Sequence, residues 1–167
     1  MAKGLAALRL LVIDDNAQMR VIIGSVLRAA GVRRIHYAPD GRSGLEAVTQ
    51  HKPDVAYVDY EMPRMNGLEF TAAVRAMTGP ERFLPIIVLT GHSDAPRLTM
   101  ARDRGATEFI CKPVTARTIL TRLETVVMNP RPFVTAPGYF GPDRRRRSPE
   151  DYDGPLRRAA DQAVVSL

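Results

Sequence analysis

The chain has 167 residues, a length that suits one domain of ordinary size with an appendage. It carries 24 Lys and Arg against 18 Asp and Glu, and the resulting net charge of +6 raises nucleic acid as a partner class. The single cysteine, Cys111, excludes an internal disulfide framework and a cysteine-based zinc site. The apolar stretch at residues 10–13 is too short to cross a membrane, so we expect a soluble cytoplasmic protein without membrane insertion.

Residues 1–128 alternate between short apolar runs and amphipathic stretches. The apolar runs predict strands at residues 8–13, 33–37, 54–58, 85–90 and 107–111. The helical spacing predicts helices at residues 19–30, 43–51, 67–77, 95–104 and 115–128. The central runs are almost continuously apolar, which is typical of parallel strands that are covered on both faces. Five successive β-α units predict an α/β fold, a doubly wound five-stranded parallel sheet with five helices.

Polar side chains stand where four of these predicted strands end. Asp14 and Asp15 follow the first strand, Asp59 the third, Thr90 closes the fourth and Lys112 follows the fifth. Because the carboxyl ends of parallel strands meet at one edge, we expect these side chains to converge in the crevice there. Any one of these residues taken alone could be an ordinary polar residue at a strand end. The complete set of acids, threonine and lysine favours a functional site.

The convergent residue types predict a particular chemistry. Clustered carboxylates raise each other's pKa unless a cation lies among them, and hard oxygen ligands suit Mg²⁺. A carboxylate flanked by Mg²⁺ and a lysine can attack a phosphoryl group, because both cations stabilise the added charge. Thr90 can donate a hydrogen bond to a phosphoryl oxygen. The sequence therefore predicts a site that forms an aspartyl phosphate.

At this point the chain resembles the CheY-like receiver domains of bacterial two-component response regulators. The resemblance covers residues 8–128 and implies the flavodoxin-like strand order 2-1-3-4-5. The residues that carry it are Asp14-Asp15, Asp59 with the following Met62-Pro63-Arg64-Met65-Asn66-Gly67, then Thr90-Gly91 and Lys112-Pro113.

The resemblance implies a role for each matching residue. Asp59 would accept the phosphoryl group from a sensor histidine kinase or a histidine phosphotransfer protein. Asp15 would bind Mg²⁺ directly, Asp14 through water, and Glu61 through its backbone carbonyl. Lys112 would pair with the phosphoryl group, and the Lys112-Pro113 bond would be cis, as only an X-Pro bond readily is. Such a protein is a signalling phospho-acceptor rather than an enzyme, apart from self-catalysed phosphotransfer and autodephosphorylation.

The resemblance also predicts how phosphorylation is read out. Thr90 would move toward the phosphoryl group, and Phe109 would act as the aromatic switch, without the hydroxyl that a tyrosine would offer. Glu61 and His92 are either exposed side chains or residues that tune the phosphate lifetime, and His92 can titrate near neutral pH. The expected partner face comprises residues 95–104, 107–111 and 115–128. Its candidate exposed positions are Thr115, Arg117, Arg122 and Thr125.

Residues 129–167 form a Pro- and Arg-rich tail. Six prolines at 130–155 break helices, so we expect residues 129–157 to be extended or disordered, with a short amphipathic helix at residues 157–165. The tail repeats a Tyr-x-Gly-Pro-x-Arg-Arg motif 13 residues apart. In each copy, Gly-Pro would fix a turn, Tyr would pack as an amphipathic anchor against a partner, and Arg-Arg would bind a carboxylate or phosphate. The alternative is a solvated tail in which the two copies resemble each other by chance. The two copies are Tyr139, Gly141, Pro142, Arg144 and Arg145, and Tyr152, Gly154, Pro155, Arg157 and Arg158.

Together these features predict a single-domain response regulator, with a receiver domain at residues 1–128 and the tail at residues 129–167. It would signal by phosphorylation-dependent protein contact, through the partner face, the tail, or onward phosphotransfer. Two rival hypotheses are a phosphate-independent adaptor and a nucleic-acid binder that uses the tail. Acids that follow the run of four arginines at residues 144–147 disfavour the second. A haloacid-dehalogenase-type phosphatase is a distant third, because Asp-x-Asp is absent after the first strand.

Overall fold

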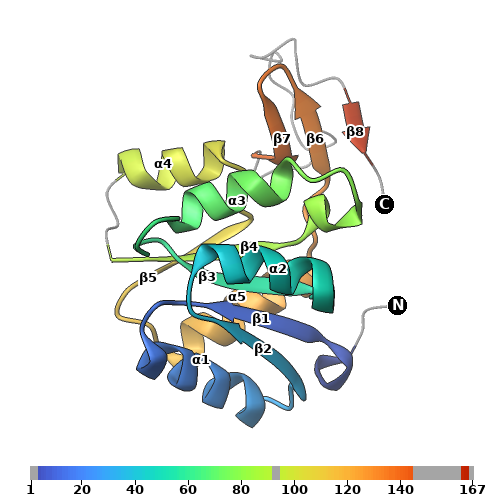
Figure 1. Ribbon diagram of the computed structural model, residues 1–167. Coiled ribbons are helices and arrows are strands. Elements are labelled where there is room, and N and C mark those ends of the chain that lie inside the picture. The colour runs from blue at the N-terminus through green and yellow to red at the C-terminus, as the bar shows by residue number, and fades with distance from the viewer. Residues whose placement is uncertain (1–3, 92–94, 145–162, 166–167) are drawn as a thin grey trace.

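The computed structural model describes residues 4–91, 95–144 and 163–165. Its main part is a parallel sheet of strand order β2-β1-β3-β4-β5 with helices on both faces (Figure 1). In chain order the elements are η1 (Leu5–Ala7), β1 (Arg9–Ile13), α1 (Ala17–Ala29), β2 (Arg34–Ala38), α2 (Gly41–His51), β3 (Val55–Asp59), α3 (Gly67–Arg75), η2 (Pro80–Phe83), β4 (Ile86–Thr90), α4 (Ala95–Asp103), β5 (Glu108–Cys111) and α5 (Ala116–Met128). This confirms the predicted α/β fold and strand order, with strand ends within one residue of the prediction. Within the described residues, no helix is both long and apolar enough to span a membrane.

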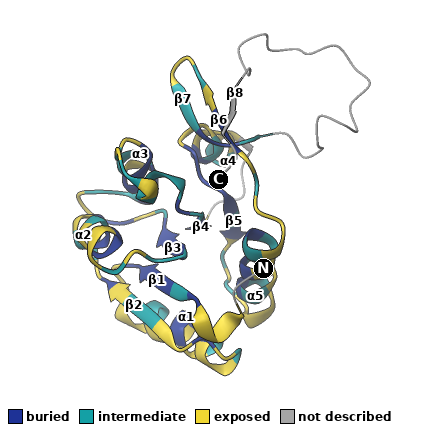
Figure 2. Cartoon of the chain, turned by 90° about the vertical axis from the view of Figure 1, so that its right-hand side faces the viewer, coloured by how far each residue is buried: buried dark blue, intermediate teal, exposed yellow. Residues whose placement is uncertain are grey.

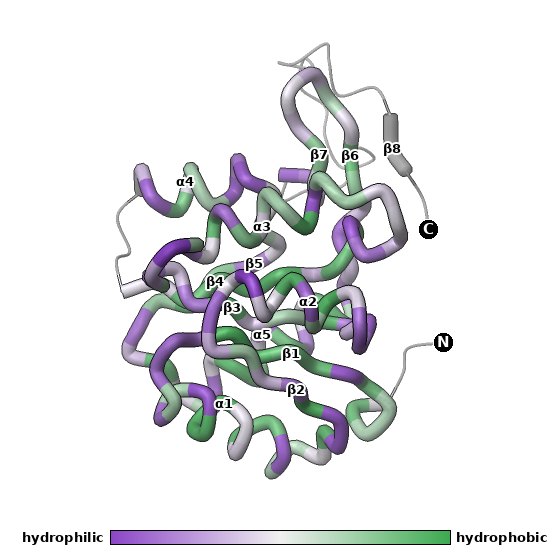
Figure 3. The backbone as a smooth tube through the Cα atoms, viewed as in Figure 1, coloured by the Kyte–Doolittle hydropathy of each residue, from purple (hydrophilic) through white to green (hydrophobic). Residues whose placement is uncertain are grey.

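The central strands β1, β3 and β4 are buried on both faces, and their successive side chains enter opposite layers. In β1, Leu11 and Ile13 join the core that includes Phe70 of α3. Leu10 and Val12 join the other core, which includes residues of α1 and α5. All residues of β3 and β4 are buried, as the continuous apolar runs predicted. Figures 2 and 3 show the same pattern, with the buried, hydrophobic central strands inside and the exposed edge strand β2 and more exposed helices outside.

A second, antiparallel sheet follows α5. β6 (Phe133–Ala136) and β7 (Tyr139–Pro142) form a hairpin, and β8 (Ala163–Val165) pairs with the other edge of β6. The hairpin turns at Gly138, whose φ of 74° favours glycine. Residues 129–157 were predicted to be extended or disordered; within them, residues 133–136 and 139–142 form strands, and Phe133 and Val134 are buried. The predicted helix at residues 157–165 is wrong at residues 163–165, which form a strand, and its remainder lies outside the described residues.

The hairpin lies beside α3 and α4 (Figures 1 and 2). Aromatic and cationic side chains hold it against the parallel-sheet part. The Phe83 ring meets Phe133 and Phe140 edge-on, with centroids 5.2 and 5.4 Å away. Arg75 of α3 is buried, donates from Nε and Nη2 to the carbonyl of Gly105, and lies 5.0 Å from the centre of the Phe133 ring. The hairpin therefore covers a buried guanidinium that would otherwise meet solvent.

Two histidines stack at the edge of the sheet. The rings of His36 in β2 and His51 at the end of α2 lie 3.8 Å apart and 8° from parallel. Burial lowers the pKa of His36, and the nearby charges of His51 and Arg9 lower it further. Protonation of His36 is thus unfavourable in the folded chain.

This stack predicts a loss of stability in mild acid. A histidine whose folded pKa lies below its unfolded value stabilises the fold above that value, and the contribution is lost as the pH falls. The melting temperature should therefore drop between about pH 7.5 and about pH 5.5, and it should drop less in His36→Gln. Thermal melts followed by far-UV circular dichroism measure both. Equal drops in the two proteins would show that His36 does not contribute.

Candidate functional site

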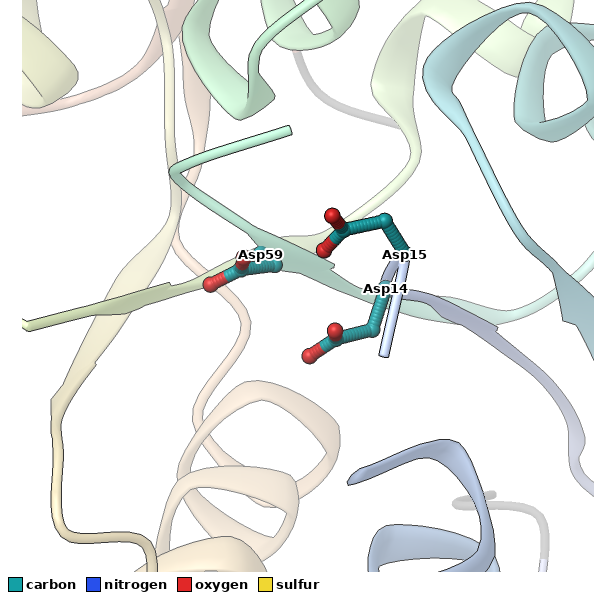
Figure 4. Close-up of side chains that lie close together, drawn as sticks. All are labelled: Asp14, Asp15 and Asp59. Carbon is teal, nitrogen blue, oxygen red and sulfur yellow. The ribbon is translucent and has the colours of Figure 1, made fainter. Parts of the chain in front are cut away.

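Three carboxylates meet at the carboxyl edge of the parallel sheet (Figure 4). Asp14 and Asp15 follow β1 directly, and Asp59 is the last residue of β3. One oxygen of each lies within 4.8 Å of the others. Asp14 is 1% exposed and Asp59 4%, whereas Asp15 is exposed. The predicted convergence is therefore present, with two buried acids and one that faces solvent.

Lys112 is the cation of this cluster. Its Nζ lies 2.8 Å from Oδ1 of Asp59, and its backbone N–H donates to the carbonyl of Thr90 at 2.8 Å. Burial lowers the pKa of Lys112, but the hydrogen bond and charge of Asp59 and the charge of Asp14 outweigh it, so the pKa is raised. Lys112 is therefore held protonated beside Asp59. The Lys112-Pro113 bond is cis, as expected, and Thr90 is 2% exposed at the end of β4.

The buried acids hold unfavourable negative charge. Burial raises the pKa of both Asp14 and Asp59. The charge of Asp15 raises both further, and the charge of Asp59 adds to the rise at Asp14 and that of Glu61 to the rise at Asp59. Oδ2 of Asp14 is buried without a hydrogen-bond partner in the described part of the chain. A buried, unpartnered carboxylate oxygen among three acids is a donor set that fits a hard divalent cation such as Mg²⁺.

Local hydrogen bonds fix the position of Asp14. Its Oδ1 accepts from the backbone N–H of Asn16 at 2.9 Å, which leaves Oδ2 for another partner. The Asn16 side chain caps α1 by accepting from the N–H groups of Gln18 and Met19. Arg20 of α1 donates to the carbonyl of Asp14 at 2.6 Å. The start of α1 thus holds Asp14 from two sides.

The loop after Asp59 returns close to Asp59 itself. A Cβ on Gly67 would lie 2.5 Å from the carbonyl oxygen of Asp59, so the close return needs glycine. Asn66 caps α3, and Glu69 completes the capping box by accepting from the Asn66 N–H at 2.9 Å. The Asn66-Gly67 pair in the family motif therefore has a structural reason.

The predicted tuning residues are only partly described. Glu61 is exposed and its carboxylate lies 3.5 Å from Nη1 of Arg97 in α4. His92 lies outside the described residues. The role of Arg97 could not be predicted, because no sequence pattern distinguishes an ion-paired helical arginine from a solvated one. Arg97 links the loop that follows Asp59 to α4.

The predicted switch residue Phe109 is half-buried in β5 and packs against the core that includes Phe70. Its carbonyl accepts from Nε of Arg122 at 3.1 Å. Among the candidate positions of the partner face, Thr115 and Arg117 are exposed, whereas Arg122 and Thr125 are half-buried. Thr115 also caps α5.

The first copy of the tail motif packs on its own chain. Gly141 and Pro142 lie in β7, so the predicted turn at this Gly-Pro is wrong, and the turn is at Gly138. Tyr139 donates its hydroxyl to the Pro142 carbonyl at 2.8 Å, and the Arg144 guanidinium lies 3.8 Å from the Tyr139 ring centre. Arg144 also binds a carboxylate, that of Asp103 in α4, at 2.8 Å. Arg145 and the second copy lie outside the described residues.

Known proteins match the main part of this chain. The family described as "Response regulator receiver domain" matches residues 10–124. A protein-glutamate methylesterase/protein-glutamine glutaminase of Natronomonas pharaonis is 40% identical over 112 residues, which are 66% of this chain and 30% of that protein. The transcriptional regulatory protein PdtaR of Mycobacterium tuberculosis is 30% identical over 130 residues, or 78% of this chain and 62% of that protein. The chain thus spans less than two thirds of each of these relatives.

A solved structure agrees. The chemotaxis protein CheY4 of Vibrio cholerae superposes with a TM-score of 0.67 at 33% identity, over 71% of this chain and 98% of that one. The residues 10–124 that match the receiver family contain the acid cluster, Thr90 and Lys112. The chain therefore belongs to the CheY-like receiver domains of two-component response regulators.

Proposed function

We propose that this chain is a response regulator that accepts a phosphoryl group on Asp59 from a phosphohistidine of a sensor histidine kinase or phosphotransfer protein. The observation that carries the proposal is the buried Asp59 carboxylate, held 2.8 Å from Lys112 and among two further acids. The resulting signal passes to a protein partner through the face of α4, β5 and α5. The chain's own activity is limited to phosphoryl transfer onto itself and hydrolysis of the product.

Each residue has a defined part in the transfer. An Asp59 carboxylate oxygen attacks the phosphorus, a P–O bond forms, and the P–N bond to the donor imidazole breaks with its electron pair going to nitrogen. Lys112 offsets the charge on the phosphoryl oxygens, and the Thr90 hydroxyl donates to one of them. Asp14, Asp15, Asp59 and the backbone carbonyl of Glu61 would hold Mg²⁺, which supplies further charge neutralisation when bound.

Chemical trapping tests the acceptor directly. After incubation with acetyl phosphate and Mg²⁺, borohydride should reduce the acyl phosphate, and peptide mass spectrometry should find homoserine at position 59. Omitting Mg²⁺ by adding a chelator should abolish the product. Trapping at another residue, or none at all, would reject Asp59 as acceptor and favour the phosphate-independent adaptor.

A substitution at Asp14 tests the cation site through stability. Asp14→Asn should raise the free energy of unfolding in the absence of Mg²⁺ by about 1 to 3 kcal/mol, because it removes a buried charge with an unpartnered oxygen. Mg²⁺ should raise the melting temperature of the unaltered chain but not of Asp14→Asn. The exposed Asp15→Asn is the comparison, and its gain in stability should be smaller. A destabilised Asp14→Asn would contradict the expected charge strain.

The tail-mediated nucleic-acid hypothesis receives less support. Arg144, the first of the Arg run, is engaged with Asp103 and stacks on Tyr139. A cation paired within its own chain offers less free charge to a phosphate backbone. In function the chain divides into a receiver at residues 1–128 and a tail at residues 129–167, whose hairpin packs on the receiver.

A further inference from the structure

A small pocket opens where the C-terminal segment meets α4 and β5. Its volume is about 50 Å³, room for a small polar group such as a carboxylate. It is lined by Arg102, Thr107, Glu108, Phe109, Arg131 and Arg144, and we call it the arginine pocket. Arg131 and Arg144 lie beyond residue 124, where the match to the receiver family ends. The hairpin and its flanks therefore complete a pocket that the matched region alone lacks.

The charges around the arginine pocket leave an excess of cations. The Glu108 carboxylate forms ion pairs with Nη2 of Arg131 at 2.9 Å and with Nη1 of Arg122 at 3.5 Å, so its charge is neutralised. Arg144 is paired with Asp103, which is half-exposed. The side chain of Arg102 has no ion-pair partner in the part of the chain that the structure describes. A negative group that entered the pocket would therefore meet an uncompensated guanidinium.

The wall of the pocket is held in place before a ligand arrives. Arg144 lies between its stack on Tyr139 and its ion pair with Asp103, and Arg131 is fixed by Glu108. Prior ordering lowers the entropy that binding must overcome. Phe109 adds a half-buried aromatic surface beside the cations. A ligand that suits both features carries an acidic group next to an apolar one.

We propose that the arginine pocket binds a glutamate or aspartate side chain from an acidic segment of the protein partner that receives the signal. The inference rests on the proposed function, because it assigns the chemistry of that partner. A guanidinium presents a planar pair of donors that matches a carboxylate. Nucleic acid fits less well, because its phosphates need a row of cations, whereas these cations converge on one small pocket that also contains Glu108.

A peptide-binding assay on the full chain tests the proposal. The probe is a fluorescent 12-residue peptide of alternating Glu and Leu, and fluorescence anisotropy measures its dissociation constant. Arg102→Gln should weaken binding about tenfold, as expected for a lost charge-assisted hydrogen bond. Arg102→Lys should have an intermediate effect, because it keeps the charge and loses the planar donors. Replacing Glu by Gln in the peptide should abolish binding.

The controls separate this proposal from its rivals. Arg33→Gln is the matched control, because Arg33 is exposed before β2, at the edge of the sheet opposite β5. The affinity of this variant for the peptide should equal that of the unaltered chain. The proposal would be overturned if Arg102→Gln bound the peptide as tightly as the unaltered chain. It would also be overturned if the unaltered chain bound a single-stranded DNA 20-mer more tightly than the peptide and Arg102→Gln weakened that DNA binding. Borohydride trapping at Asp59 should persist in Arg102→Gln. In the unaltered chain, trapping that fails while the peptide still binds would overturn the phospho-acceptor function and leave the pocket assigned.

Discussion

Asp59→Asn should lose all Mg²⁺-dependent incorporation of radiolabelled phosphate from acetyl phosphate. The amide of asparagine is a poor nucleophile and carries no charge to pair with Lys112, which lies 2.8 Å from the native carboxylate. The same change removes a buried acid whose pKa is raised by burial, so the variant should remain folded. Labelling followed by gel autoradiography measures the loss, and circular dichroism checks the fold.

Asp40→Asn is the matched control for this experiment. Asp40 caps α2 by accepting from the Ser43 N–H, and asparagine caps a helix equally well. It lies outside the acid cluster, so its labelling should equal that of the unaltered chain. Undiminished labelling of Asp59→Asn would rule out Asp59 as the acceptor. Residual labelling would show that a neighbouring acid also accepts the phosphoryl group.

Phe133→Ala should lower the free energy of unfolding by about 3 to 5 kcal/mol, the usual cost of truncating a buried phenylalanine. The Phe133 ring is 6% exposed and contacts both Phe83 and the buried Arg75. Its removal leaves a cavity and uncovers a guanidinium whose partners are backbone carbonyls. Urea unfolding followed by far-UV circular dichroism measures the change.

Thr135→Ala in the same strand separates packing from strand formation. Thr135 is exposed on β6, and its substitution should change the unfolding free energy by less than about 0.5 kcal/mol. A Phe133→Ala variant as stable as Thr135→Ala would mean that the hairpin adds little to the folded unit, and that the predicted boundary at residue 128 holds for stability as well.

The parallel sheet and its site could be predicted because their determinants are local. The run Val55–Asp59 shows in five residues both a fully buried strand and the acid at its end. Parallel topology then brings such ends together without further information. Asp14, Asp59, Thr90 and Lys112 are adjacent in space for this reason.

The hairpin could not be predicted because its partners are remote in sequence. Phe133 and Phe140 pack on Phe83, some 50 residues earlier, and no periodic pattern records that contact. The prolines indicated disorder, yet Pro142 lies in β7, at the edge of the sheet where a missing N–H is tolerated. The pairing of Glu61 with Arg97 and the stacking of His36 on His51 depend likewise on tertiary structure.

The burial of Arg75 under Phe133 bears on how this gene can recombine. A crossover that joined new coding sequence at the end of α5 would remove Phe133, which covers Arg75, and leave the Arg75 guanidinium of α3 without that cover. A crossover after Arg144 would keep the cover intact. Viable fusions and exchanges in this lineage should therefore carry the hairpin along with the receiver as one inherited unit.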